Sequence, residues 1–305
     1  MILPRLQDGE LARGAIGRLR TFNELPSYAA GVKCIRLQAG TDDESLSVLE
    51  ALALVMGMSL QALTTQYTML PYTAHVAIVD ASKTECPWSS PTLRRLGLAL
   101  PRGNAYFCRS CVAADLVGGF SYWRREHQLP GAYICRLHEE PLLRTLDLSA
   151  LDDQPYESMA TAALDPLATD PETLESDAVA RFQSFAEAFL TRAHPIDEAQ
   201  YVAAVLRRGA EYGFVTRPRI KCQRISELVS RNFPAQWLLD IFPGIEGVAP
   251  GELFAPIDYV LKATGYAATA GHCAALAIMY RSPSEFFEAL AAEHPAVHGG
   301  GRSNN

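Results

Sequence analysis

The sequence has 305 residues, which is enough for two compact domains that each bury a core. Apolar residues make up 49% and charged residues 20%, so a disordered chain is excluded, and the longest apolar runs are far too short for a membrane span. The net charge of −7 excludes a protein that coats DNA with its whole surface, because such binding requires neutralised phosphates. The N-terminus shows no secretory signal, so we expect a cytoplasmic protein.

The first hundred residues predict helices. Residues 8–25 carry apolar side chains at helical spacing on one face, with Asp8 as the expected N-cap. Two further helices are expected at 43–56, where the acidic start suits the helix dipole, and at 60–67. A short strand is expected at 74–79.

An acidic segment at 146–177 separates the two halves of the chain. It contains no lysine or arginine, and prolines interrupt it, so we expect an exposed linker between domains. After it, helical patterns return at 178–191, 197–211, 223–231, 234–241, 256–263, 270–280 and 284–292, the last with Ser284 as N-cap.

These patterns predict a mainly α protein with two helical domains. We place an N-terminal domain at 1–145, with a small cysteine-rich module at about 106–142, and a helical C-terminal domain at 178–297. Residues 298–305 are glycine-rich and polar, so we expect a disordered tail.

The cysteine-rich module carries the most specific chemical signal. Cys108 and Cys111 are separated by two residues, and 23 residues later Cys135 and His138 repeat that spacing. Two residues between ligands let both side chains of a tight turn, or knuckle, reach one ion, and two knuckles complete a tetrahedron of three sulfurs and one nitrogen. We therefore predict one structural Zn²⁺ ion per chain on these four residues. A closed shell leaves no site for an activated water, which argues against metal-assisted hydrolysis.

Alternatives to this arrangement are left open by the sequence. His127 is a rival fourth ligand, although it lies outside a Cys-x-x-His knuckle. The three cysteines could instead be ordinary buried side chains or include a redox pair. A redox cysteine pair would need a preceding parallel strand and a following long helix, and neither pattern occurs. Four cysteines stand alone and are expected to be small buried side chains: Cys34, Cys86, Cys222 and Cys273. No phosphate-binding loop, nucleophile elbow or zinc-protease motif occurs.

The stretch between the two knuckles contains one tryptophan and a Pro-Gly pair. We expect Trp123 to pack beside the knuckles, because burial of its ring would stiffen this stretch. Pro130-Gly131 is expected to form the turn that returns the chain to Cys135.

Basic residues concentrate at 201–231, where there are seven lysines and arginines and only two acidic residues, Glu211 and Glu227. The helices expected at 223–231 and 234–241 make a candidate helix-turn-helix pair. The candidate DNA contacts are Arg217, Arg219, Lys221 and Arg224, and a solvated charged face is the alternative. A second basic group lies near the cysteines and either bonds to backbone carbonyls or contacts a partner: Arg94, Arg95, Arg102, Arg109, Arg124 and Arg125.

Three short runs around the expected ligands share one wider pattern. Residues 106–111 read Tyr-Phe-Cys-Arg-Ser-Cys, and residues 122–131 read Tyr-Trp-Arg-Arg-Glu-His-Gln-Leu-Pro-Gly. The third run places Pro-Leu at 141–142 after the second knuckle. Together they resemble the hallmark of the TniQ family, transposition proteins related to the TnsD target selector. The resemblance covers residues 1–145 and extends into the C-terminal half only as diffuse helical patterns.

The resemblance implies a non-catalytic adaptor for target-site choice. Proteins of this family bind target DNA or a DNA-bound guide complex and recruit an AAA+ ATPase, which in turn brings the transposase. Some act as homodimers beside CRISPR guide-RNA effector complexes. We therefore expect target DNA, such a guide complex and the AAA+ ATPase as partners, a homodimer as a candidate assembly, and no membrane. The rival functions are a zinc-stabilised DNA-binding transcription regulator and a zinc enzyme with an open coordination site.

Overall fold

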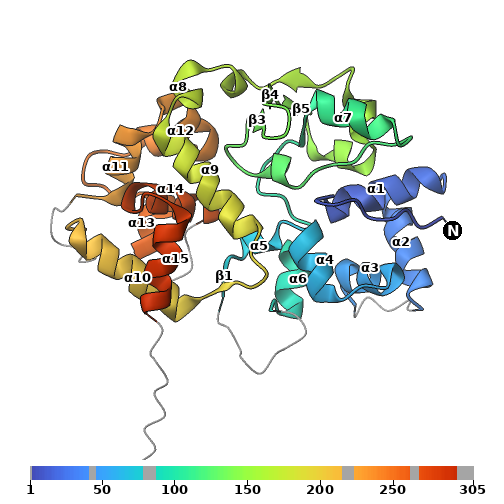
Figure 1. Ribbon diagram of the computed structural model, residues 1–305, viewed down its shortest axis with the longest axis horizontal. Helices are drawn as coiled ribbons and strands as arrows, with labels where there is room; N and C mark the ends of the chain where they lie inside the picture. Colours follow the sequence, from blue (N-terminus) through green and yellow to red (C-terminus); the bar gives the residue numbers. More distant parts are fainter. Residues whose placement is uncertain (1, 41–45, 78–86, 215–222, 262–267, 294–305) are drawn as a thin grey trace, which may run out of the picture.

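The computed structural model describes residues 2–40, 46–77, 87–214, 223–261 and 268–293, and there the chain is mainly helical, as the sequence predicts. The first half contains α1 (Ala12–Phe22), α2 (Tyr28–Gln38), α3 (Val48–Met56), α4 (Leu60–Tyr67), α5 (Leu70–Thr73), α6 (Ser90–Leu96) and α7 (Arg109–Leu116). The second half contains α8 (Pro171–Leu174), α9 (Asp177–Leu190), α10 (Glu198–Glu211), α11 (Ile225–Asn232), α12 (Ala235–Ile241), α13 (Ala255–Asp258), α14 (Thr269–Met279) and α15 (Pro283–Ala292). Figure 1 shows α1 to α4 on one side, α9 to α15 on the other, and α7 above α1.

Short strands fasten distant segments together. β1 (Val76–Ala77), within the strand expected at 74–79, pairs in parallel with β7 (Ile196–Asp197). The antiparallel sheet β2-β5-β6 consists of β2 (Tyr106–Phe107), β5 (Leu143–Arg144) and β6 (Ala163–Leu164). β3 (Ile134–Cys135) and β4 (Glu140–Pro141) form a separate antiparallel pair. The β2-β5-β6 sheet links the cysteine-rich module to the acidic segment, and the β1-β7 pair links the segment after α5 to the start of α10.

Several helices begin at other residues than predicted, and in α3 and α15 the capping serine is a different one. α1 begins after Leu11 rather than after Asp8. α3 begins after Ser47, which forms a capping box with Glu50, and residues 43–45 of the expected helix lie outside the described residues. α15 is capped by Ser282 instead of Ser284. α3 and α4 meet at a bend of 106°, and no single helix among the described residues is long and apolar enough to cross a membrane.

Among the described residues, two large hydrophobic cores and a small cluster around the three cysteines hold these elements together. The smaller of the two large cores lies within the first half and includes Ile16, Leu52 and Leu63. The larger core includes Phe107 and Trp123 from the cysteine-rich module together with residues of the C-terminal half. The apolar stripe predicted for α9 is buried there: Val179, Phe182, Phe185, Ala186 and Phe189. The two halves therefore share a core, and the domain limits at 145 and 178 stay a prediction.

The acidic segment is folded against its neighbours rather than extended as an exposed linker. It contains three 3-10 helices, at Leu148–Asp152, Pro155–Ser158 and Pro166–Ala168, followed by α8. The carboxylates of Asp147, Asp165 and Asp170 cap these turns by accepting backbone N–H bonds. The structure differs from the prediction because three of these carboxylates cap local turns. A count of charges does not distinguish capping carboxylates from solvated ones.

A buried histidine fastens the first half to the C-terminal helices. His75 lies between α5 and β1, and its ring stacks on Phe189 of α9, with the ring centroids 4.3 Å apart. Burial, together with the nearby His272, holds the pKa of His75 well below its usual value. His75 therefore stays neutral in the folded chain at pH values where the unfolded chain takes up a proton.

Replacing His75 by phenylalanine should make folding less sensitive to acid. Because the folded pKa is lowered, the stabilisation is present above the unfolded pKa of about 6.5 and is lost as pH falls below it, by up to about 1.4 kcal/mol per pH unit. We expect His75→Phe to reduce the loss of unfolding free energy between pH 7 and pH 5.5, measured by urea titration. The exposed His194, replaced in the same way, is the control. Equal slopes in parent and His75→Phe would contradict the assignment.

Candidate metal centre

The first knuckle joins β2 to α7. Cys108 is the N-cap of α7, and its Sγ accepts a hydrogen bond from the backbone N–H of Cys111 at 3.4 Å. Both sulfurs are buried. An N–H donor at this position favours a negatively charged sulfur, so the helix start suits a thiolate ligand.

The second knuckle is the turn between β3 and β4. Glu139 takes a left-handed conformation with φ 54°, and its N–H donates to the carbonyl of Cys135 at 2.7 Å. β2, which ends at Phe107, pairs with β5, which opens at Leu143. Because these strands flank the two knuckles, their pairing brings Cys108 to the turn that holds His138.

The four predicted ligands converge. Nδ1 of His138 lies 3.5, 3.3 and 3.7 Å from the Sγ atoms of Cys108, Cys111 and Cys135, and the last two sulfurs are 3.7 Å apart. All four ligand atoms lie within 4.8 Å of one another. A tetrahedral ion with bonds of about 2.3 Å to sulfur and about 2.0 Å to nitrogen needs ligand atoms roughly 3.5–3.8 Å apart. The group can therefore hold a metal ion.

The rival ligand His127 stays apart from this group. It belongs to the 3-10 helix Glu126–Gln128, and it is not one of the four converging residues. Burial, followed by the charges of Arg124 and His138, lowers the pKa of His127 to about 3. His127 is therefore a neutral buried side chain.

The residues between the knuckles build the support of the site. Trp123 is buried as predicted, packs edge-on against Phe107 and donates from its indole to the carbonyl of Asp153 at 2.8 Å. The side-chain amide of Gln128 bonds to both the N–H and the C=O of Tyr106, and thereby completes the pairing of β2. The Leu-Pro-Gly run ends at Gly131, which has φ 77°.

Several arginines near the cysteines bond to groups of the protein itself. This favours the first of the two alternatives for this group, bonding within the fold, over contact with a partner. Arg124 forms a two-bond pair with Asp115 at 2.8 Å, and its guanidinium lies over the ring of Tyr122. Arg125 donates to the carbonyls of Thr65, Thr68 and Leu190. Arg102 donates to the carbonyls of Leu129 and Ala132.

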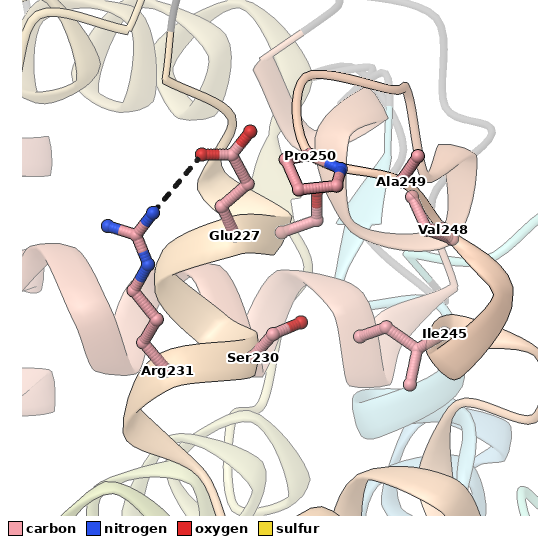
Figure 2. Close-up of a pocket in the computed structure, with 8 residues that line it drawn as sticks. Glu227, Ser230, Arg231, Ile245, Val248, Ala249 and Pro250 are labelled. Atoms are coloured by element: carbon pink, nitrogen blue, oxygen red, sulfur yellow. Dashed lines mark ion pairs between the residues drawn. The ribbon is translucent and has the colours of Figure 1, made fainter.

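The candidate DNA contacts are described only in part. Arg217, Arg219 and Lys221 lie outside the described residues, whereas Arg224 precedes α11 and its Nε lies 3.4 Å from the carbonyl oxygen of Gly251. Figure 2 shows the neighbouring hollow, where Arg231 of the same basic stretch points toward Glu227, with 3.8 Å between the charged atoms. α11 and α12 form close to the predicted positions, and their role as a helix-turn-helix pair stays a prediction.

Two residues of the site were not predicted. Ser110 of the first knuckle donates its hydroxyl to the carboxylate of Glu140, at 2.6 and 2.7 Å from the two oxygens. The only signal for them in the sequence is their position. Ser110 lies between Cys108 and Cys111, and Glu140 lies two residues after His138. Of the cysteines expected to be buried, Cys273 is buried, Cys34 is half-buried, and Cys86 and Cys222 lie outside the described residues.

Fold and site together define a mainly helical protein with a buried Cys3His metal-binding group. A comparison with curated proteins finds no match. The sequence model of the TniQ family matches residues 1–142, and this part of the chain belongs to that family. The TniQ domain indicates an adaptor role associated with transposition.

Proposed function

We propose that the protein is a non-catalytic transposition adaptor that recognises target DNA, or a DNA-bound guide complex, and recruits the AAA+ ATPase regulator of the transposase. The match of residues 1–142 to the TniQ family carries this proposal. The closed set of four ligands supports it, because no position in that set is left for a reacting water. Co-purification of the chain with the AAA+ ATPase tests the recruiting step.

We propose further that the ion is Zn²⁺. Three sulfurs and one nitrogen at tetrahedral spacing are a donor set typical of structural zinc, and this set fits the four residues. Bound zinc would tie the two knuckles together and contribute its binding free energy to folding. Elemental analysis of protein purified without chelators measures the metal and its amount per chain.

Replacing the candidate DNA contacts Arg217, Arg219, Lys221 and Arg224 by alanine should weaken DNA binding similarly for all sequences. If these side chains contact phosphates, the slope of log affinity against log salt falls by about one for each lost contact. If these side chains serve only DNA binding, thermal stability should change little, because surface charges contribute little to folding. The measurement is DNA affinity at several salt concentrations, together with pull-down of the AAA+ ATPase, which should be unaffected.

A matched control removes four positive charges elsewhere. Lys33 and Arg36 of α2 and Arg94 and Arg95 of α6 give the same change in net charge when replaced by alanine. Loss of affinity in the control alone would place the contact on α2 and α6. Unchanged affinity and slope in the first variant would remove the basic stretch from DNA binding, and lost ATPase pull-down would make it a protein contact.

The same measurements separate the rival functions. A transcription regulator would bind DNA with the salt dependence described above but would not capture the ATPase. A guide-dependent adaptor would be captured by the guide-RNA effector complex and would bind bare DNA weakly. Size-exclusion chromatography with light scattering tests the proposed homodimer.

A further inference from the structure

A groove separates α12 from the folded acidic segment. It has a volume of about 680 Å³, and the described residues that line it come from β5, from the stretch 165–171 and from α12. Figure 1 shows α8, which begins at the end of that stretch, next to α12. None of these lining residues belongs to the metal centre or to the candidate DNA contacts, so the groove is a separate feature of the surface.

Two carboxylates of the groove are held in place by buried tyrosines. The hydroxyl of Tyr106 donates to Oδ2 of Asp165 at 2.8 Å, and the hydroxyl of Tyr133 donates to Oδ2 of Asp240 at 2.5 Å. Both tyrosine rings are buried, and they come from the cysteine-rich module. Carboxylates fixed in this way lose little conformational freedom when a ligand binds, so they are preorganised for one.

The groove carries an excess of negative charge. Its described lining contains one guanidinium and three carboxylates: Arg144, Asp165, Asp170 and Asp240. Arg144 lies 3.4 Å from Asp165, whereas Asp170 and Asp240 form no ion pair within the described part of the chain. The acidic segment and α12 contain no lysine or arginine. The groove therefore attracts cationic groups and repels phosphates.

This charge bears on the candidate helix-turn-helix pair. In such a pair the second helix lies in the major groove of DNA, and its side chains reach the base edges. The second helix here is α12, and it presents Gln236, Leu239 and Asp240 to the groove in the protein. With two more carboxylates on the opposite wall, this face would repel the phosphates of DNA. It is therefore poorly suited to reading a DNA sequence.

The same face suits a cationic segment of a protein, because apolar surface lies beside the carboxylates. We propose that the groove docks a segment of a partner protein that carries lysine or arginine together with apolar side chains, and that α12 faces protein rather than DNA. The cationic groups pair with Asp170 and Asp240, and the apolar side chains pack on Pro166, Pro171 and Leu239. This docking site is independent of the adaptor role proposed above.

The test is binding of a fluorescent peptide of alternating arginine and leucine to the full chain, measured by anisotropy. Asp170→Asn combined with Asp240→Asn removes two charges and keeps the oxygens that accept the hydrogen bonds of Thr173 and Tyr133. The affinity of this double variant should fall about fivefold, the loss expected for two surface ion pairs. The same peptide with glutamate in place of arginine should not bind the parent.

A matched control removes two charges elsewhere. Glu157 and Glu288 are exposed and lie outside the groove, so replacing both by glutamine gives the same change in net charge. The peptide affinity of this control should stay within about twofold of the parent. Gln236→Lys supplies a further variant, because it places a positive charge in the groove from an exposed position and should also weaken peptide binding severalfold.

A parent chain that does not bind the peptide, or equal losses in the asparagine variant and the glutamine control, would overturn the proposal. If the asparagine variant fails to fold, Gln236→Lys decides, with weaker peptide binding in support and any other result against. Loss of duplex DNA affinity in Gln236→Ala would make α12 a DNA-reading helix and would also overturn the proposal. Peptide binding by a chain that does not capture the AAA+ ATPase would refute the adaptor role and leave the groove assigned.

Discussion

Replacing Cys135 by serine is expected to abolish metal binding and to lower the free energy of unfolding by several kcal/mol. Cys135 is completely buried, and its Sγ lies within 3.7 Å of both Cys111 Sγ and His138 Nδ1. Its loss opens the tetrahedron, and structural zinc contributes about 10–16 kcal/mol of binding free energy in isolated peptides, part of which is folding free energy. Elemental analysis and a chemical denaturation curve measure the two effects.

The half-buried Cys34 of α2 provides the control for this variant. Cys34→Ser should retain one ion per chain and unfold close to the parent, because Cys34 lies outside the group of four. A Cys135→Ser protein that unfolds like the parent, or a parent that carries no metal, would refute a structural metal centre. Treatment of the parent with a strong chelator should reproduce the loss of stability without any substitution.

The second large effect is expected at the buried ion pair between Glu10 and Arg18. Both side chains are essentially inaccessible, and two hydrogen bonds of 2.9 and 2.6 Å join the guanidinium to the carboxylate. Arg18 also donates to the carbonyl of Arg5 and lies over the ring of Phe120. Glu10→Ala would leave the Arg18 charge buried without its partner, which costs about 3–5 kcal/mol in comparable pairs. Urea denaturation measures the change.

Replacing both partners tests whether the ion pair adds stability or only avoids the cost of an unpaired buried charge. Glu10→Leu combined with Arg18→Met leaves no buried charge, so the double variant should regain most of the stability lost in Glu10→Ala. Arg20→Ala, which breaks a more exposed pair with Asp153, should cost about 1 kcal/mol or less. If Glu10→Ala lowers the free energy of unfolding by less than Arg20→Ala does, water reaches the Glu10–Arg18 pair.

The sequence predicted helices with a clear periodic pattern better than weakly patterned ones. α4 and α9 form within a residue of their expected limits, because each has a clear apolar stripe or a capping serine. α2 was not predicted, since it buries only Gly31 and Ile35 and offers no continuous apolar stripe. α6 and α7 were missed as well, because α6 buries only Leu93 and the apolar side chains of α7 do not gather on one face.

The four candidate ligands were predictable because their spacing is local, whereas the support around them was not. The pairing of Phe107 with Leu143 and the bond between Ser110 and Glu140 join residues about thirty positions apart. Contacts between residues so far apart in the chain leave no periodic pattern in the sequence. The folding of the acidic segment was missed for the same reason. It depends on contacts between distant residues, such as the hydrogen bond from the Trp123 indole to the carbonyl of Asp153.

The hallmark run that identifies the family also restricts how the chain can diversify. At Gly131, an added Cβ would come within 3.2 Å of Phe182 and 3.3 Å of Trp237, both in the C-terminal half. Arg125 reaches Leu190 of the same half. A C-terminal half taken from a relative must therefore present a matching aromatic surface to this turn. Exchange of C-terminal halves between relatives should therefore succeed only when the exchanged half keeps both sides of this contact.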